Sequence, residues 1–168
     1  VSLAIGTAQN TAGAGTDTLI SIENLIGSNF NDTLTGDANA NVIRGGAGND
    51  KITGGNGDDI LYGGAGNDTI DGGDGYDTVN YSGSTTGVSV NLAVTIAQNT
   101  GGEGTDTLIS IEHIIGSGSH DTLTGGDSDN SLSGGAGNDS LLGGAGYDFL
   151  TGGSGSDTMT GGVGDDTF

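Results

Sequence analysis

Aspartate returns every nine residues through two long stretches of this chain, each time six places into a glycine-rich segment. The pattern is Gly-Gly-x-Gly-x-Asp-x-apolar-x, whose places are numbered 1 to 9 below. Glycines at positions 1, 2 and 4 let the backbone bend until its carbonyl groups converge, and the aspartate adds negative charge. Calcium takes about six to eight such oxygens, so two turns must combine to complete one site. The regular position-6 residues are Asp50, Asp59, Asp68, Asp77, Asp139, Asp148, Asp157 and Asp166.

The elements that must position these turns are short strands. The three residues after each turn fit a strand whose apolar side chain points inward and whose neighbours point outward. Two nonapeptides would then make one right-handed coil with a turn on each side, and stacked coils form an all-β parallel solenoid. No segment has helical periodicity with caps, so we expect little or no helix. The expected inward column is Leu34, Ile43, Ile52, Leu61, Ile70, Val79, Leu123, Leu132, Leu141, Leu150, Met159 and Phe168.

A larger repeat contains the smaller one. Residues 1–79 align with residues 90–168 at a constant offset, and 47 of the 79 aligned positions are identical. This duplication predicts that the chain is an internal piece of a long tandem array. Each unit is divided into a spacer and an array of nonapeptides. We place a truncated spacer at 1–26, the first array at 27–80, the second spacer at 81–115 and the second array at 116–168.

The spacer at 81–115 carries a different pattern from the arrays. Apolar residues alternate with small or polar ones from Val88 to Ile96, which predicts a half-buried strand. One isolated nonapeptide follows at 101–109. Because Asp106 and Asp121 lie 15 residues apart, fewer than the 18 of two nonapeptides, we expect a shortened coil that pairs these two turns, and Asp17 with Asp32 likewise.

Composition makes folding conditional. The 168 residues include 38 glycines, 22 acidic residues and two basic ones, for a formal net charge of −20. Few aromatic residues and strong self-repulsion are typical of disorder, so we expect an expanded chain without divalent cations and an ordered one with them. No basic patch is present to meet nucleic acid. The absence of cysteine excludes disulfides and thiolate metal sites, and no apolar run is long enough to insert in a membrane.

The two arrays strongly resemble the RTX, or hemolysin-type, calcium-binding repeats, which form parallel β-rolls. The resemblance implies that each ion lies between turns one coil apart. The earlier turn would give the carbonyls of positions 2 and 4 and its aspartate, and the later turn the carbonyls of positions 1 and 3 and its aspartate. The four regular sites implied are Gly46, Gly48 and Asp50 with Gly63, Ala65 and Asp68; Gly55, Gly57 and Asp59 with Gly72, Asp74 and Asp77; Gly135, Gly137 and Asp139 with Gly152, Ser154 and Asp157; and Gly144, Gly146 and Asp148 with Gly161, Val163 and Asp166.

Other turns depart from the pattern. Two further sites would pair an irregular first turn with a regular second one. Asparagine replaces the position-6 aspartate at Asn41 and Asn130, which weakens a calcium site by one charged ligand. Whether these turns, and those of Asp17 and Asp106, hold calcium stays open, so we expect six sites and at most ten. The two irregular pairs are Asp32 with Gly45, Ala47 and Asp50, and Asp121 with Gly134, Ala136 and Asp139.

The sequence offers little support for a catalytic site. Ser119, His120 and Asp121 are the residue types of a hydrolase triad, but adjacent residues on one turn point apart. His113 is expected on a spacer strand, and Glu23 and Glu112 on strand faces or turns. Threonines that flank the inward residues could form ice-binding rows, but bulky and charged residues interrupt them. We therefore expect no enzyme activity in this chain.

The resemblance also implies a setting. It points to a calcium-binding structural module of a large bacterial protein that is exported unfolded by type I secretion and folds on extracellular calcium. The whole protein could be a surface adhesin, an S-layer or filament subunit, or a toxin, and copies could stack end to end. The alternatives are an accessory domain of an RTX protease, lipase or epimerase, and an ice-binding module.

Overall fold

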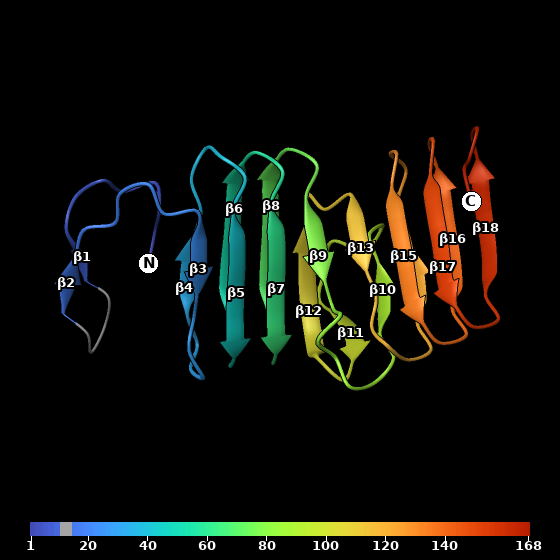
Figure 1. The fold of residues 1–168 in the computed structure, drawn as a ribbon, viewed down its shortest axis with the longest axis horizontal. Coiled ribbons are helices and arrows are strands. Elements are labelled where there is room, and N and C mark those ends of the chain that lie inside the picture. The colour runs from blue at the N-terminus through green and yellow to red at the C-terminus, as the bar shows by residue number, and fades with distance from the viewer. Residues whose placement is uncertain (11–14) are drawn as a thin grey trace.

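The computed structural model describes residues 1–10 and 15–168, so the part of the first spacer at 11–14 lies outside the described residues. The described chain consists of strands and turns and contains no helix, as the sequence predicted. Strands are stacked in a row along the long axis, with the N-terminus near one end and the C-terminus near the other (Figure 1). The fold is therefore the predicted parallel β-solenoid.

One coil corresponds to two nonapeptides. In the first array, β5 (Val42–Ala47) pairs in parallel with β7 (Ile60–Ala65), and β6 (Lys51–Asn56) pairs with β8 (Thr69–Asp74). Each partner lies 18 residues further along the chain, for example Ile43 opposite Leu61. The strands are longer than predicted, because they continue into the glycines of the next turn. The N–H of Ala47, for instance, donates to the carbonyl of Ser28 at 3.1 Å.

The two faces of the solenoid differ in continuity. One face is a single seven-stranded parallel sheet that runs through both arrays and the spacer. The other face is divided into a five-stranded and a four-stranded sheet, so the spacer interrupts it. The continuous sheet has the order β17 (Phe149–Ser154), β15 (Ser131–Ala136), β13 (His113–Ile115), β9 (Thr78–Asn80), β7, β5 and β3 (Asn24–Ile26).

The divided face has its break inside the spacer. The five-stranded sheet ends in an antiparallel hairpin of the spacer, and the four-stranded sheet begins with another spacer strand. A separate two-stranded antiparallel hairpin near the N-terminus pairs β1 (Gln9–Asn10) with β2 (Thr16–Asp17). The two sheets are β11 (Gln98–Gly101), β12 (Gly104–Ile109), β8, β6 and β4 (Thr33–Thr35), and β10 (Ser89–Asn91), β14 (Thr122–Thr124), β16 (Ser140–Ala145) and β18 (Thr158–Val163).

The core is the predicted inward column. Its ten members from Leu34 to Leu150 are all buried, and Leu108 and Ile114 of the spacer continue the column between the arrays. The prediction that the last two members are buried is wrong, because Met159 is 37% exposed and Phe168 is 65% exposed. They lie on the final coil, where no further coil covers them in the described chain.

The predicted strand from Val88 to Ile96 is mostly wrong. Only Ser89–Asn91 is extended, with Val88 and Val90 buried and Ile96 73% exposed. The side chain of Asn91 accepts a hydrogen bond from the N–H of Ala93 at 2.9 Å, which closes a turn. This turn ends the strand although the apolar alternation continues beyond it.

The shortened coil between Asp106 and Asp121 does not form. Strand β12 pairs with β8, so Thr107 lies opposite Thr69, 38 residues earlier. The turn of Asp121 is met instead by the spacer segment that leads into β10, where the N–H of Val88 donates to Oδ1 of Asp121 at 2.7 Å. The spacer hairpin therefore pairs with the last strand of the first array on this face, and β10 pairs with the first strand of the second array.

Candidate metal sites

The position-6 aspartates form hydrogen-bonded ladders along the edges of the solenoid. The backbone N–H of Asp50 donates to Oδ1 of Asp68 at 2.8 Å, and the N–H of Asp59 donates to Oδ1 of Asp77 at 2.9 Å. The same bond links Asp139 to Asp157 at 3.0 Å. Each carboxylate is thus fixed by the turn before it, and its second oxygen is directed to the turn after it.

That second oxygen is left without a partner. Among the described residues, six buried carboxylate oxygens accept no hydrogen bond, and all six are Oδ2 of position-6 aspartates. Burying a carboxylate oxygen without a compensating partner is costly unless a cation meets it. The six are Oδ2 of Asp50, Asp59, Asp68, Asp77, Asp139 and Asp148.

Glycine at position 1 leaves a cradle beside each of these oxygens. A Cβ on Gly45 would collide with Oδ2 of Asp50 and with the carbonyl oxygen of Gly63 in the next coil. Gly54 has the same relation to Asp59 and to the carbonyl of the following coil. A carboxylate oxygen and a carbonyl oxygen therefore lie together where any side chain would displace them.

The remaining carbonyls predicted as ligands also face the gap between stacked turns. The carbonyl oxygens of Gly46 and Gly48 lie against Gly64 and Gly66 of the next coil. From the other side, the carbonyl of Ala65 accepts a hydrogen bond from the N–H of Gly48 at 2.9 Å. The turns thus gather carbonyl and carboxylate oxygens, which suit calcium, and the residues present fit the ion.

Burial disfavours the charged form of these aspartates. Desolvation raises the pKa of Asp68 to about 7, against the lowering effect of the N–H bond from Asp50, and the nearby Asp106 carboxylate adds to the rise. Desolvation raises the pKa of Asp77 to about 6 for the same reason. Asp59 and Asp139 also have raised pKa values, with burial as the main cause. A bound divalent cation would reverse this penalty by favouring the carboxylates.

The irregular first turns satisfy their own carboxylates. Oδ2 of Asp32 accepts hydrogen bonds from the N–H of Ser28 at 2.6 Å and from its hydroxyl at 2.8 Å. Ser117 donates in the same way, from its N–H to Oδ2 of Asp121 at 2.6 Å and from its hydroxyl to Oδ1 at 2.7 Å. Serine at position 2 thus adds a hydroxyl donor that glycine lacks, and these two gaps have less need of a cation.

In the two turns with asparagine at position 6, the N–H of the position-2 residue donates to the side-chain oxygen of the asparagine. Oδ1 of Asn41 accepts the N–H of Asp37 at 2.8 Å, and Oδ1 of Asn130 accepts the N–H of Gly126 at 2.6 Å. Both asparagines keep their place in the ladder, because the N–H of Asn41 still donates to Oδ1 of Asp59 at 2.7 Å.

Two carboxylates that face orphan oxygens were not paired with them by sequence reasoning. The N–H of Asp68 donates to Oδ1 of Asp106 at 3.0 Å, and the N–H of Asp77 donates to Oε2 of Glu112 at 2.9 Å. These bonds continue the ladders of the first array into the spacer at separations of 38 and 35 residues. The irregular spacing hides both pairs, although the isolated nonapeptide around Asp106 was a visible signal.

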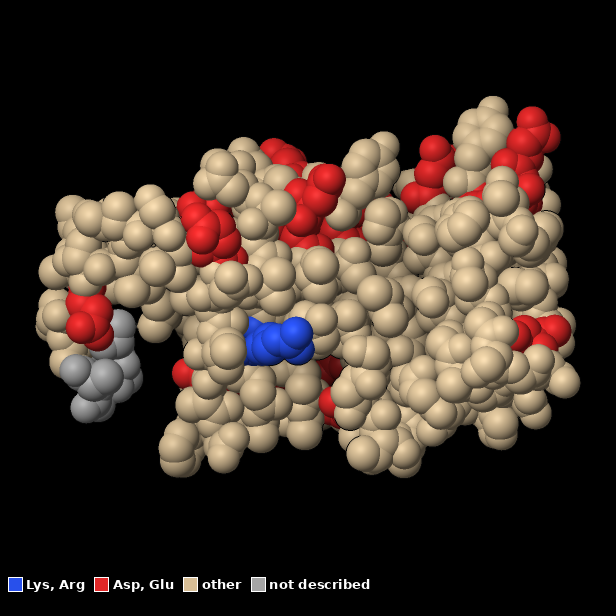
Figure 2. All heavy atoms as spheres, viewed as in Figure 1, with Lys and Arg blue, Asp and Glu red and all other residues tan. Residues whose placement is uncertain are grey.

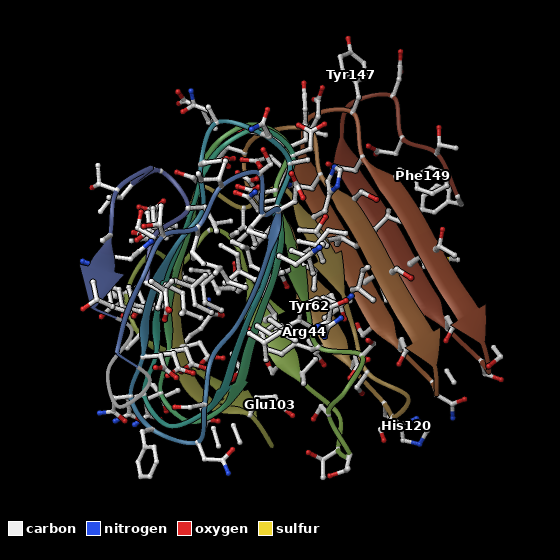
Figure 3. The ribbon with its side chains drawn as sticks, turned by 60° about the vertical axis from the view of Figure 1, so that its left-hand side comes forward. Arg44, Tyr62, Glu103, His120, Tyr147 and Phe149 are labelled. Atoms are coloured by element: carbon white, nitrogen blue, oxygen red, sulfur yellow. The ribbon has the colours of Figure 1, made fainter. Side chains whose placement is uncertain are left out.

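Position-5 side chains form a second ladder on the exposed side of the turns. Oδ1 of Asn49 accepts the N–H of Asn67 at 2.9 Å, and Oδ1 of Asp58 accepts the N–H of Tyr76 at 3.0 Å. His120 belongs to this ladder, since its Nδ1 accepts the N–H of Asn138 at 2.6 Å. That bond occupies the nitrogen and gives His120 a structural place at the tip of its turn (Figure 3).

Acidic groups dominate the surface. Figure 2 shows acidic side chains in groups along the edges of the solenoid and a single small spot of basic side-chain atoms on the visible face. The guanidinium of Arg44 lies over the ring of Tyr62, 3.5 Å from its centre (Figure 3). No three acidic, imidazole or thiol side chains converge among the residues that the structure describes. A cation in these turns must therefore take most of its ligands from main-chain carbonyls.

The parallel coils and the oxygen-lined turns define a calcium-binding β-roll. The family model for the RTX calcium-binding nonapeptide repeat matches four times, at residues 22–52, 44–79, 111–141 and 133–168. These matches cover more than half of the chain, which therefore belongs to the RTX calcium-binding repeat family. No curated protein sequence matches it. The described part of the chain has no helix with the length and apolarity needed to cross a membrane.

Proposed function

We propose that this chain is a structural module that folds on calcium, within a large protein that bacteria secrete and display at their surface. The observation that carries the proposal is the set of six buried aspartate oxygens that lack a hydrogen-bond partner among the described residues. They belong to a chain with a formal charge of −20 and two basic residues. Bound calcium supplies the missing positive charge, and the turns supply the oxygens that orient it.

The ligand sets that we propose follow from the orphan oxygens. Each faces the gap between its own turn and the next, and five of the six give the four regular sites in the arrays and the Asp68–Asp106 gap at the spacer hairpin. The carbonyl of Glu103, at position 3 of the spacer nonapeptide, accepts the N–H of Gly66 at 2.8 Å, as Ala65 does for Gly48. The Asp32 and Asp121 gaps are proposed as weaker sites, because serine already satisfies their carboxylates.

Export and display are supported by the charge and by the repeat. A chain that lacks calcium repels itself and stays open, so it suits passage through a secretion channel in a compartment poor in calcium. Extracellular calcium then stabilises the folded state, because it binds the folded turns and not the open chain. Among surface proteins, an extended adhesin, S-layer or filament fits best with a rod built from tandem units.

End-to-end stacking is supported by the duplication. Residues 69–79 pair with residues 104–115 inside the chain. The C-terminal residues 158–168 repeat the first of these segments, and residues 15–26 repeat the second. The end that carries β3 exposes Ile26 and Phe30, both 78% exposed, and the other end exposes Phe168. A second copy placed end to end would repeat the internal junction and cover these groups.

The decisive experiment is a calcium titration of the chelated chain followed by far-UV circular dichroism, with magnesium as the control. A cooperative gain of β signal with calcium alone is the expected result. A chain already folded in chelator, or one still disordered in millimolar calcium, would contradict the proposal. Sedimentation velocity at the end of the titration tests stacking, since end-to-end contacts give species longer than one chain.

A further inference from the structure

Glu112, a spacer residue, occupies the place of a position-6 aspartate. The N–H of Asp77 donates to Oε2 of Glu112 at 2.9 Å, as the N–H of Asp59 does to Oδ1 of Asp77. The backbone agrees, because the N–H of His113 donates to the carbonyl of Asp77 at 2.9 Å and the N–H of Thr78 to that of Asp59 at 2.8 Å. Glu112 is therefore in register with the ladder although no nonapeptide surrounds it.

Ser110 takes the place of the position-1 glycine in the same turn. Its carbonyl oxygen lies against Gly72, as the carbonyl of Gly72 lies against Gly54 one coil earlier. A turn of six residues is thus reduced to the three residues 110–112, and Ser110 adopts a left-handed backbone with φ of 50°. Glutamate has one methylene more than aspartate, which suits a carboxylate that must reach across a shortened turn.

An unpartnered buried oxygen faces this shortened turn. Asp77 is fully buried, and its Oδ2 accepts no hydrogen bond from any described residue. A Cβ on Gly72 would collide with both this Oδ2 and the carbonyl oxygen of Ser110. The two oxygens therefore lie together beside Gly72. The Glu112 carboxylate lies in the same turn, because it accepts a hydrogen bond from the N–H of Asp77.

We propose that Asp77, Glu112 and the Ser110 carbonyl hold a divalent cation of the calcium class at the junction between the first array and the spacer. By their repeat positions, Gly73 and Gly75 contribute carbonyls from the earlier turn, and water completes the shell. The proposal rests on the proposed function only in that the regular turns bind calcium. Two of its ligands, Ser110 and Glu112, lie outside the nonapeptide pattern.

The location of this site gives it a role in joining the arrays. Strands β9 and β13, which flank it, are neighbours in the continuous sheet, and β13 is bonded in turn to β15 of the second array. Asn130 of the second array also donates from Nδ2 to the carbonyl of Glu112 at 3.1 Å. A cation held at Glu112 therefore links the last coil of the first array to the first coil of the second.

The sequence offers a matched pair of variants. Glu112→Gln removes the charge but keeps an acceptor for the N–H of Asp77. Glu23→Gln makes the same change in an identical octapeptide, because residues 16–23 repeat as 105–112. Within the described residues, no turn precedes Glu23 as Gly72–Asp77 precedes Glu112. Bound calcium is counted by native mass spectrometry across a series of free calcium concentrations, with circular dichroism as a check on folding.

The expected result is one ion fewer for Glu112→Gln, with Glu23→Gln equal to wild type. Equal counts for all three chains, or one ion lost from both variants, would overturn the junction site. A wild type that binds no calcium would instead refute the proposed function. If Glu112→Gln does not fold, Glu112→Asp keeps the charge and should fill its last site at about tenfold more calcium. Unchanged affinity in Glu112→Asp would also count against direct ligation.

Discussion

The phenol hydroxyl of Tyr81 donates a hydrogen bond to Oδ2 of Asp106 at 3.1 Å, and both side chains are buried. The hydroxyl of Thr100 donates to the same oxygen at 2.9 Å. Both oxygens of Asp106 thus accept hydrogen bonds, since its Oδ1 accepts the N–H of Asp68. Tyr81 therefore fastens the start of the spacer to the hairpin that closes the first array.

Tyr81→Phe removes one of the two hydroxyl donors to Oδ2 of Asp106 while keeping the ring in the core. We expect the calcium-loaded chain to lose about 1–3 kcal/mol of unfolding free energy, because the bond is to a charged acceptor. Urea unfolding at saturating calcium measures the change. Tyr147→Phe is the control, since the Tyr147 side chain is 67% exposed. Equal stability of both variants would show that the buried bond contributes nothing.

Asp58 and Asp59 are adjacent, but they belong to different ladders. Asp59→Asn removes a charge from two inter-turn gaps and should lower the number of bound calcium ions and raise the calcium midpoint of folding by about tenfold or more. Asp58→Asn removes the same charge from the exposed ladder and keeps its acceptor for Tyr76, so we expect little change. Calorimetric titration of both variants is the measurement. A similar effect in both would indicate that overall charge, and not ligation, sets the affinity.

Gly45→Ala introduces a methyl group into the cradle beside Asp50. Because this group would collide with two of the proposed ligand oxygens, we expect loss of the Asp50–Asp68 site and a less stable calcium-loaded fold. Gly83→Ala is matched to it, since a Cβ there meets nothing within 4 Å. The control should be neutral or gain about 0.4–1 kcal/mol from a less flexible unfolded chain. Ion counts and urea unfolding distinguish the two, and an unchanged ion count in Gly45→Ala would remove the cradle from the proposed site.

Acid should favour the metal-free fold and oppose calcium. The pKa of Asp68 is about 7 and that of Asp77 about 6 in the folded chain, against an ordinary value of 3.8. The fold therefore takes up protons between about pH 4 and pH 7, so its stability without metal falls as the pH rises through this window. Calcium must displace these protons, so its apparent affinity should rise from pH 5.5 to pH 7.5.

The measurement for this pH dependence is circular dichroism in chelator at pH 5.5 and 7.5, followed by calcium titration at both values. Asp68→Asn cannot titrate at this position and should show a smaller pH dependence of affinity. A calcium midpoint that does not move with pH in wild type would mean that the buried aspartates are already ionised without metal.

The regular arrays could be predicted from the sequence because their period equals half a coil. Once Asp50 and Asp68 are assigned to stacked turns, the facing carbonyls and the inward Ile52 and Ile70 follow from counting. The spacer could not be predicted in this way, since its partners lie at separations of 38 and 35 residues that no period announces. The turn at Asn91 shows the same limit: one side-chain hydrogen bond ended a strand that the apolar pattern extended to Ile96.

Glu112 illustrates why the missed site was invisible in sequence. A glutamate after a serine and an isoleucine has no resemblance to Gly-Gly-x-Gly-x-Asp, and the identical Glu23 has no such partner among the described residues. What selects Glu112 is its neighbour in space, Asp77, and that neighbour is known only when the coils are stacked.

The unequal faces of the solenoid have a mechanical consequence. One face carries an unbroken series of parallel strands from β3 to β17, whereas the opposite face is interrupted within the spacer. The continuous sheet resists extension along the solenoid axis, and the opposite face gives way most easily where its two sheets are separated. In a tandem array of such units, compliance would therefore recur once per repeat, on one side of the rod.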